Sequence, residues 1–238
     1  FKSIGFNDKG ALHENINKNT AAVIVEPIQG EGGIRVFPEE TLKLIRNLCD
    51  KTGTLLIIDE VQCGLGRTGK LFAHEWYNIK PDIMAIAKGI GGGFPLGACL
   101  SSKNASIGMV QGKHGSTYGG NPMGCAVAIE TNKNILKPEF LSTIRRKGDF
   151  FKERLQGLLE MFPEQILDVR GRGLMLGLKC VSKNVHLIDM CRREKLLLVP
   201  GASNTVRILP PLTITYKEIK EAIIRLERAL LRMRKFNE

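Results

Sequence analysis

Short, almost purely apolar runs alternate with helical patterns in the first half of the chain, and this alternation constrains the fold most. The predicted strands occupy residues 21–25, 54–58, 82–86 and, as a shorter candidate, 96–100. Between the first two, residues 38–51 read as a helix, because Pro38 stands in the first turn and Gly53 lies just beyond the last. Strands that are apolar throughout are typical of a parallel sheet covered on both faces, so the order predicts an α/β layered fold.

The second half shows a different order of elements. Predicted helices lie at residues 122–136, 140–161, 185–194 and 216 to about 234. Predicted strands lie at residues 166–169, 173–180, 196–199 and 206–209. This order indicates a smaller α+β unit, and we place the domain boundary near Lys137-Pro138. The expected domains are therefore residues 1–137 and 138–238.

Composition excludes several classes of protein. The chain has 238 residues, of which 43% are apolar and 25% charged, an ordinary globular mixture. No apolar run is long enough to span a membrane. The net charge of +11 comes from dispersed basic residues, so neither nucleic acid nor a membrane is an expected partner.

Cysteine usage and the N-terminus bear on the compartment. The six cysteines stand at positions 49, 63, 99, 125, 180 and 191 and never form a CxxC pair. This spacing favours buried, reduced thiols over a disulfide framework or a metal site. No signal or transit segment is visible, and we expect a cytoplasmic protein.

One glycine-rich string matches two nucleotide-binding motifs by its letters alone. Residues 64–69 fit GxGxxG, yet five residues separate them from the preceding strand and no clear helix follows. The same string gives GxxxxGK, but Leu71 stands where a Walker motif needs Ser or Thr. Both matches are interpreted as coincidences.

Two polar residues are more informative because each follows a predicted strand. Asp59 comes directly after one apolar run, and Lys88 follows the next one. Alone, such an aspartate more often caps a turn or pairs with an arginine, and such a lysine is more often a solvated loop residue. Together they place an acid and an amine at the carboxyl edge of one sheet, where ligands of open α/β sheets bind.

Pyridoxal 5'-phosphate (PLP) chemistry needs such a pair of groups. A lysine can form a Schiff base with the cofactor aldehyde and can then shuttle a proton. A carboxylate beside the ring nitrogen keeps that nitrogen protonated, which makes the ring an electron sink. Lys88 and Asp59 could fill these two roles.

Four strings then carry a family resemblance. They are VIVEPIQGEGG (23–33), LIIDEVQCGLGRTG (56–69), PDIMAIAKGIGGGFPLGA (81–98) and HGSTYGGNPMGC (114–125). In order and spacing they resemble class III aminotransferases, which are PLP enzymes of fold type I, and most closely the acetylornithine/ornithine group. The resemblance runs from about residue 20 to the C-terminus and implies that residues 1–137 are the C-terminal part of the PLP-binding large domain.

The resemblance implies roles for five residues that follow the predicted strands at 54–58 and 82–86. Lys88 would be the Schiff-base lysine, and Asp59 would pair with the pyridine nitrogen. Glu60 and Val61 would complete the strand-end turn, with Val61 packing on the ring face. Gln62 would hydrogen-bond on the side of the ring hydroxyl.

Four further residues gain roles only through the resemblance. Thr117 would reach the cofactor phosphate of a neighbouring subunit, which implies a homodimer, and Ser116 would lie near the substrate. Arg207 would bind the substrate α-carboxylate, for which a guanidinium fork is suited. Glu31 would neutralise that arginine when no carboxylate is bound. Alone, Arg207 would be read as a surface ion pair and Glu31 as a loop residue.

The expected reaction moves the terminal amino group of acetylornithine to 2-oxoglutarate, giving a semialdehyde and glutamate, a step of arginine biosynthesis. Ornithine, succinyl-diaminopimelate and 4-aminobutyrate stay open as donors. A protein of another class, an inactive remnant kept for its fold or for dimerisation, also stays open.

The family's N-terminal half has no counterpart in residues 1–20, so the sequence is interpreted as the C-terminal portion of a longer enzyme. Three explanations stay open: the sequence is part of an intact enzyme, the gene is split or decaying, or the protein is a stable remnant without enzymatic activity. We expect the 238 residues alone to be inactive or nearly so.

Overall fold

A computed structural model describes residues 1–237, with side chains through Arg234. The chain forms two compact units that interleave in sequence. The first comprises Phe1–Pro27, Phe37–Leu65 and Lys70–Lys137. The second comprises Ile28–Val36, Gly66–Gly69 and the residues from Pro138 onward. The sequence patterns did not anticipate the two short segments that join the second unit, and the assignment of the units to the family's two domains stays a prediction.

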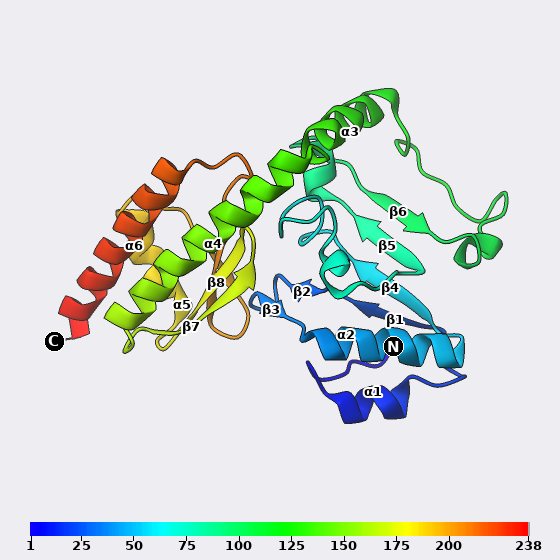
Figure 1. The fold of residues 1–238 in the computed structure, drawn as a ribbon, viewed down its shortest axis with the longest axis horizontal. Coiled ribbons are helices and arrows are strands. Elements are labelled where there is room, and N and C mark those ends of the chain that lie inside the picture. The colour runs from blue at the N-terminus through cyan, green and yellow to red at the C-terminus, as the bar shows by residue number, and fades with distance from the viewer. Residues whose placement is uncertain (238) are drawn as a thin grey trace. The chain divides into compact units, whose positions relative to one another are not determined.

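The first unit is built on a four-stranded, mostly parallel sheet (Figure 1). Its strands are β1 (Ala22–Val25), β4 (Leu55–Asp59), β5 (Ile83–Ile86) and β6 (Ala98–Ser101), in that spatial order. The first three are parallel, and β6 runs antiparallel to β5. This arrangement agrees with the predicted α/β class.

Helix α2 (Glu39–Thr52) covers one face of this sheet. Pro38 precedes its first turn, and Gly53 ends it in the left-handed conformation at φ 74°. Its buried Leu42 and Ile45 pack in one cluster with Leu56 of β4. The opposite face is less covered by the described residues. Ile24 of β1, for example, is 67% exposed.

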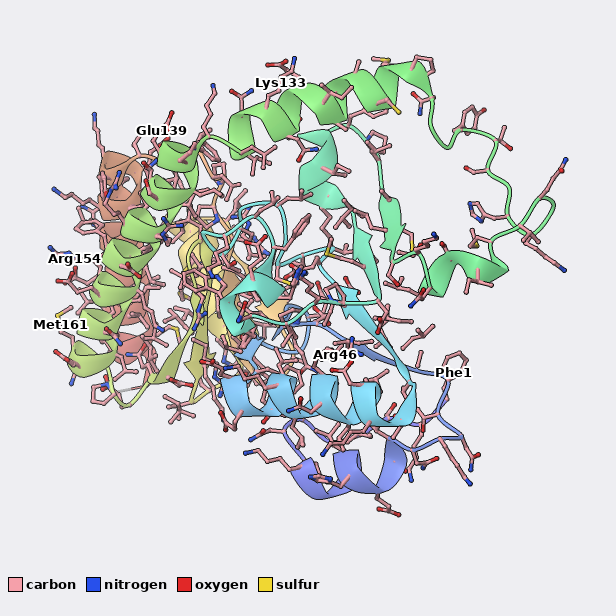
Figure 2. The ribbon with its side chains drawn as sticks, turned by 45° about the vertical axis from the view of Figure 1, so that its right-hand side comes forward. Phe1, Arg46, Lys133, Glu139, Arg154 and Met161 are labelled. Carbon is pink, nitrogen blue, oxygen red and sulfur yellow. The ribbon has the colours of Figure 1, made fainter. Side chains whose placement is uncertain are left out.

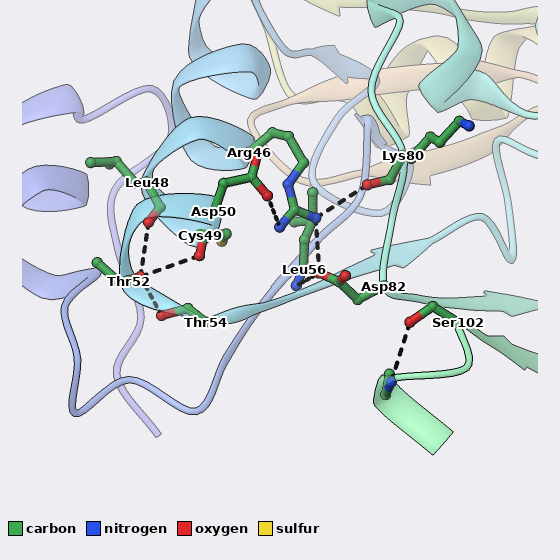
Figure 3. Close-up of polar contacts among 11 residues, drawn as sticks. Arg46, Leu48, Cys49, Asp50, Thr52, Thr54, Leu56, Lys80, Asp82 and Ser102 are labelled. Carbon is green, nitrogen blue, oxygen red and sulfur yellow. Dashed lines mark hydrogen bonds and ion pairs between the residues drawn. The ribbon is translucent and has the colours of Figure 1, made fainter. Parts of the chain in front are cut away.

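A partly buried arginine ties α2 to the sheet (Figure 3). Arg46 donates to Oδ2 of Asp82 at 2.8 Å and to the carbonyl of Lys80 at 3.1 Å, and it forms an ion pair with Asp50 at 2.8 Å. The same Asp82 oxygen accepts from the amide of Leu56 at 2.7 Å. This network holds the starts of β4 and β5 together and links both to α2.

The rest of the first unit consists of short helices and one longer one. Helix α1 (Lys9–Asn15) packs against α2 and has no counterpart in the sequence-based prediction. The single-turn helices are η1 (Ala73–Tyr77), η2 (Lys88–Gly91) and η3 (Ala105–Gly108). Helix α3 (Pro122–Ile135) begins at the predicted residue and packs against η2.

The second unit is an antiparallel sheet packed against helices, an α+β arrangement. Its strands are β7 (Ile166–Arg172), β8 (Met175–Cys180), β10 (Thr205–Ile208) and β9 (Val199–Gly201), in that order. Its helices are α4 (Pro138–Met161), α5 (Asn184–Arg193) and α6 (Tyr216–Asn237). The two-residue strands β2 (Ile28–Gln29) and β3 (Arg35–Val36) form a hairpin that was not predicted.

Three sequence-based expectations need correction. The strand expected at 196–199 lies at Val199–Gly201, because Leu196 still closes the end of α5 by donating to the carbonyl of Cys191 at 2.8 Å. Leu174 lies in the β7–β8 turn rather than in a strand. Two cysteines, Cys99 and Cys125, are exposed rather than buried.

Within residues 1–237, no helix is both long and apolar enough to cross a membrane.

Close packing of α4 gives a stability prediction. A Cβ on Gly148 would lie 2.5 Å from the backbone of Gly173, whereas a Cβ on Gly157 of the same helix would meet open space. We expect Gly148→Ala to lower the free energy of unfolding by about 1–3 kcal/mol, since overpacking outweighs the gain in helix propensity. Gly157→Ala is the matched control and should raise it by up to about 1 kcal/mol. Urea unfolding of both variants checks this, and equal stabilities would contradict it.

Candidate active site

The sheet brings Asp59 and Lys88 to the same edge. Asp59 is the last residue of β4 and is in register with Ala85 of β5. Lys88 follows β5 three residues after Ala85. Because β4 and β5 are parallel, their carboxyl ends coincide, and both side chains originate where the sequence predicted them.

The turn after β4 fixes one oxygen of the Asp59 carboxylate. Oδ1 accepts a hydrogen bond from the amide of Val61 at 2.9 Å. Within the described part of the chain, Oδ2 has no hydrogen-bond partner. The turn itself is held because the amide of Glu60 donates to the carbonyl of Ala85 at 2.9 Å. Asp59 is therefore an oriented acceptor with one oxygen left to bind a donor.

Lys88 has an unusual backbone. Its φ is +49°, in the left-handed region that non-glycine residues rarely enter. Such a conformation costs about 1–3 kcal/mol and persists only where the surroundings impose it. Here the buried Ile90 and Gly91 anchor η2, and Gly92 at φ +55° leaves no room for a Cβ beside Thr131 of α3. The exposed Lys88 side chain thus starts from a rigid, strained position, which is common at functional sites.

Residues 60–62 behave differently from one another. The side chain of Glu60 is completely buried and binds amides at the start of η1. Val61 and Gln62 are half-buried beside Asp59 in the sequence. Their expected contacts with a cofactor stay predictions.

The second unit contains an ion pair between Arg207 and Glu31. Nη1 of Arg207 lies 2.6 Å from Oε1 of Glu31, and its Nε donates to the carbonyl of Pro200 at 2.9 Å. The arginine side chain is 9% exposed, whereas the glutamate side chain is 78% exposed. Arg207 is therefore a fixed cation on β10, and its acidic partner can leave it without giving up buried surface.

The β2–β3 hairpin holds Glu31 in place. The main-chain carbonyl of Glu31 accepts from the amide of Ala202 at 2.8 Å. Gly33 follows at φ +100°, and a Cβ there would lie 2.4 Å from the carbonyl oxygen of Ala202. Ile34 is fully buried at φ +51°, a strained conformation for a β-branched residue. Only a glycine-rich loop permits this approach, which explains the string QGEGG physically.

Sequence reasoning missed Arg67, which lies between Gly66 and Gly69 in a string read as a coincidental motif. Its Nη1 donates to the carbonyls of Leu174 and Pro210, and its own carbonyl accepts from the amide of Leu174. Burial lowers the pKa of the Arg67 guanidinium to about 10. Through its bond to Pro210, Arg67 therefore holds the chain just beyond the end of β10. Pro210 lies three residues after Arg207. In the sequence, an arginine within a glycine-rich string was the only available signal.

Ser116 and Thr117 lie in an exposed segment between η3 and α3. Oγ of Ser116 accepts from the amide of Gly119 at 2.9 Å, and Thr117 is exposed. Figure 2 shows the side chains of this segment spread along an extended path that leads into α3, the helix of Lys133. Several large apolar side chains on and beside the segment are exposed, namely Ile107, Met109, Val110, Tyr118 and Met123. The structure does not bring Ser116 or Thr117 to the Asp59 turn.

Comparisons with known proteins agree with these features. Residues 6–230 match the family Aminotransferase class-III. The chain is 52% identical over 226 residues to an acetylornithine aminotransferase of Mesorhizobium japonicum, covering 95% of this chain and 57% of that protein. It is 46% identical over 223 residues to one of Clostridium acetobutylicum, covering 93% and 57%. The chain thus spans a little over half the length of these relatives.

Solved structures are similar as well. The ornithine aminotransferase of Toxoplasma gondii matches with a TM-score of 0.93 and 34% identity, over 99% of this chain and 57% of that one. The N-acetylornithine aminotransferase of Stenotrophomonas maltophilia matches with a TM-score of 0.88 and 34% identity, over 98% and 62%. These matches confirm the predicted fold type I. From its family match over residues 6–230, the chain belongs to the class-III aminotransferases.

Proposed function

We propose that the protein is an aminotransferase that moves the terminal amino group of acetylornithine to 2-oxoglutarate, giving a semialdehyde and glutamate. The observation that carries the proposal is the pairing of Asp59 and Lys88 at one sheet edge. The relatives named acetylornithine aminotransferase support this donor. Ornithine is the second candidate, because a solved ornithine aminotransferase matches with a TM-score of 0.93.

Class-III aminotransferases use PLP, and the residues present fit that cofactor. Asp59 has one carboxylate oxygen already oriented and one open for a ring N–H. Lys88 supplies an exposed amine on a rigid backbone. When bound, PLP supplies an aldehyde that captures amines and a protonated ring that withdraws electrons. Thr117 is proposed to hold the phosphate in a neighbouring subunit, and Ser116 to lie near the substrate.

The chain's own groups then divide the chemistry. Lys88 would hold the cofactor through its side-chain amine and would carry a proton as general base and acid. The Asp59 carboxylate would keep the ring nitrogen of the cofactor protonated. Val61 would pack on the ring face, and Gln62 would hydrogen-bond on the side of the ring hydroxyl. Glu60 completes the turn that carries these groups.

Arg207 is proposed to bind the substrate carboxylate in a bidentate fashion. Glu31 pairs with the guanidinium of Arg207 while no substrate is bound. It moves away when a substrate carboxylate binds, because its side chain is mostly exposed. One site can then take both a basic amino donor and a dicarboxylate acceptor.

Neutralising Glu31 tests this exchange. We expect Glu31→Gln to lower the KM for 2-oxoglutarate by about two- to fivefold, the scale of a partly exposed ion pair, because Arg207 no longer has an internal anion to release. Steady-state kinetics of the acceptor half-reaction measures this. Glu39→Gln, a mostly exposed glutamate of α2, is the control. An unchanged or higher KM in Glu31→Gln would refute the exchange.

The assembly and compartment belong to the same proposal. We propose a cytoplasmic homodimer in which the exposed segment around Thr117 reaches the neighbouring subunit. The exposed apolar side chains on that segment support a partner surface. Sedimentation at several concentrations tests the dimer, and a protein that stays monomeric would contradict it.

Donor competition tests the reaction itself. The protein, expressed from its own gene, is assayed for glutamate formation from 2-oxoglutarate with acetylornithine, ornithine, succinyl-diaminopimelate and 4-aminobutyrate. We expect acetylornithine to give the highest kcat/KM. A higher value for another donor would reassign the substrate, and no turnover with any donor would favour an inactive remnant.

A further inference from the structure

The Glu60 carboxylate lies in a buried site made entirely of hydrogen-bond donors. Its side chain is 0% exposed. Oε1 accepts from the amide of His74 at 2.8 Å and lies 2.9 Å from His74 Nδ1. Oε2 accepts from the amide of Ala73 at 2.8 Å and from the thiol of Cys63 at 3.3 Å. All four groups can donate, so the site is matched to an acceptor-only carboxylate.

These contacts join three segments that are separate in sequence. Through its side chain, Glu60 binds the start of η1, 14 residues further along the chain. Through its amide it binds the carbonyl of Ala85 in β5, at 2.9 Å. Its carbonyl accepts from the amide of Gly64, also at 2.9 Å. The packing is tight, since a Cβ on Gly64 would lie 2.7 Å from that carbonyl oxygen.

This junction stands between the two proposed catalytic groups. Glu60 directly follows Asp59, and the residue after it, Val61, donates the amide that orients Asp59 Oδ1. Ala85, which Glu60 binds, lies three residues before Lys88. Any rotation of the Glu60 backbone would therefore move the amide of Val61 and change the direction of the Asp59 carboxylate.

We propose that Glu60, held by His74, is a positioning residue that sets the orientation of Asp59 and thereby the affinity of the protein for PLP. Burying a carboxylate is costly unless donors surround it, and four donors here fix a single geometry. A neutral apolar residue would fill the space more cheaply but could not tie η1 to the turn. The inference rests on the proposed function, since it concerns the same cofactor site.

The first test measures the PLP dissociation constant of Glu60→Gln by absorbance titration of the apoprotein. In Glu60 each carboxylate oxygen faces two donor groups. Gln replaces one of these oxygens with an NH₂ group, which is itself a donor, so one pair of donors loses its acceptor and the turn is disturbed. We expect affinity to fall by about tenfold, the lower end of the losses seen for outer-shell partners at metal sites. Glu75→Gln removes one charge from the same η1 helix and should leave affinity unchanged, because the Glu75 side chain makes no polar contact with the described residues.

A double-mutant cycle separates positioning from general structural support. If Glu60 acts through Asp59, Glu60→Gln should weaken PLP binding much less in an Asp59→Asn background than in the wild type. A purely structural role would give equal losses in both backgrounds, and that additivity would overturn the proposal. Unchanged PLP affinity in folded Glu60→Gln would overturn it as well.

His74 provides a second route should Glu60→Gln fail to fold. Asn places an N–H at the position of Nδ1, so His74→Asn should keep PLP affinity within about twofold, whereas His74→Leu should lose about tenfold. Hydrogen exchange of the Val61 amide in the apoprotein gives a readout without cofactor and should accelerate only in His74→Leu. Equal behaviour of the two variants would refute the role. A wild-type protein that binds no PLP would instead overturn the proposed function, and this inference with it.

Discussion

Replacing Lys88 with alanine should abolish transamination. In the proposed mechanism, Lys88 supplies both the amine that binds the cofactor covalently and the base that moves the proton. A positioned base alone contributes about 10²–10⁴-fold. We therefore expect kcat to fall by at least about 10³-fold. The measurement is glutamate formation with the best donor, in the protein expressed from its own gene.

A matched control distinguishes this loss from a general effect of removing a lysine. Lys103 is exposed in the same unit, and Lys103→Ala should retain wild-type turnover. Thermal unfolding should show that Lys88→Ala is folded, and relief of the strained backbone is not expected, since alanine also has a Cβ at φ +49°. Turnover within about tenfold of wild type in Lys88→Ala would exclude Lys88 as the catalytic lysine.

The second large effect is expected for Asp59→Asn. The substitution keeps the shape of the side chain and the acceptor for the Val61 amide. It removes the charge that we propose holds the proton on the ring nitrogen of the cofactor. We expect kcat to fall by about 10²–10³-fold, the range for losing one preorganised electrostatic contact in an active site. Single-turnover kinetics of the donor half-reaction isolates this step from product release.

Asp50→Asn is the control for Asp59→Asn. Asp50 is an exposed partner of Arg46 on α2, so its change should leave kcat as in the wild type. If Asp59→Asn retained kcat within about threefold, the assignment of Asp59 to the ring nitrogen would be wrong. A loss of stability without a loss in kcat would make Asp59 a structural residue of the turn.

The parts of the fold that were predictable are those with a strong local pattern. The runs that became β1, β4 and β5 are apolar throughout, and their neighbours in the sheet follow from strand–helix–strand order. The two-residue strands β2 and β3 are too short to show a periodicity, and the loop between them contacts Ala202, which is far away in the sequence. The strand predicted at 196–199 begins later, at Val199, because the amide of Leu196 bonds the carbonyl of Cys191 at the end of α5.

The candidate site divides in the same way. Asp59 and Lys88 were found from position alone, because each follows an apolar strand. The pairing of Glu31 with Arg207 spans 176 residues and was accessible only through the family resemblance. The burial of Glu60 against His74 depends on the path of the chain between β4 and η1, which no local pattern encodes. Sequence therefore locates groups at strand ends but not the contacts that orient them.

The most direct test of the central claim is to trap PLP on the protein. The purified protein is mixed with PLP, its visible spectrum is recorded, and the complex is reduced with borohydride before peptide mass mapping. The account predicts a yellow complex and a single reduced adduct on Lys88, lost in Lys88→Ala and retained in Lys103→Ala. An adduct on another lysine, scattered labelling or no adduct would contradict the assignment of this sheet edge as the cofactor site.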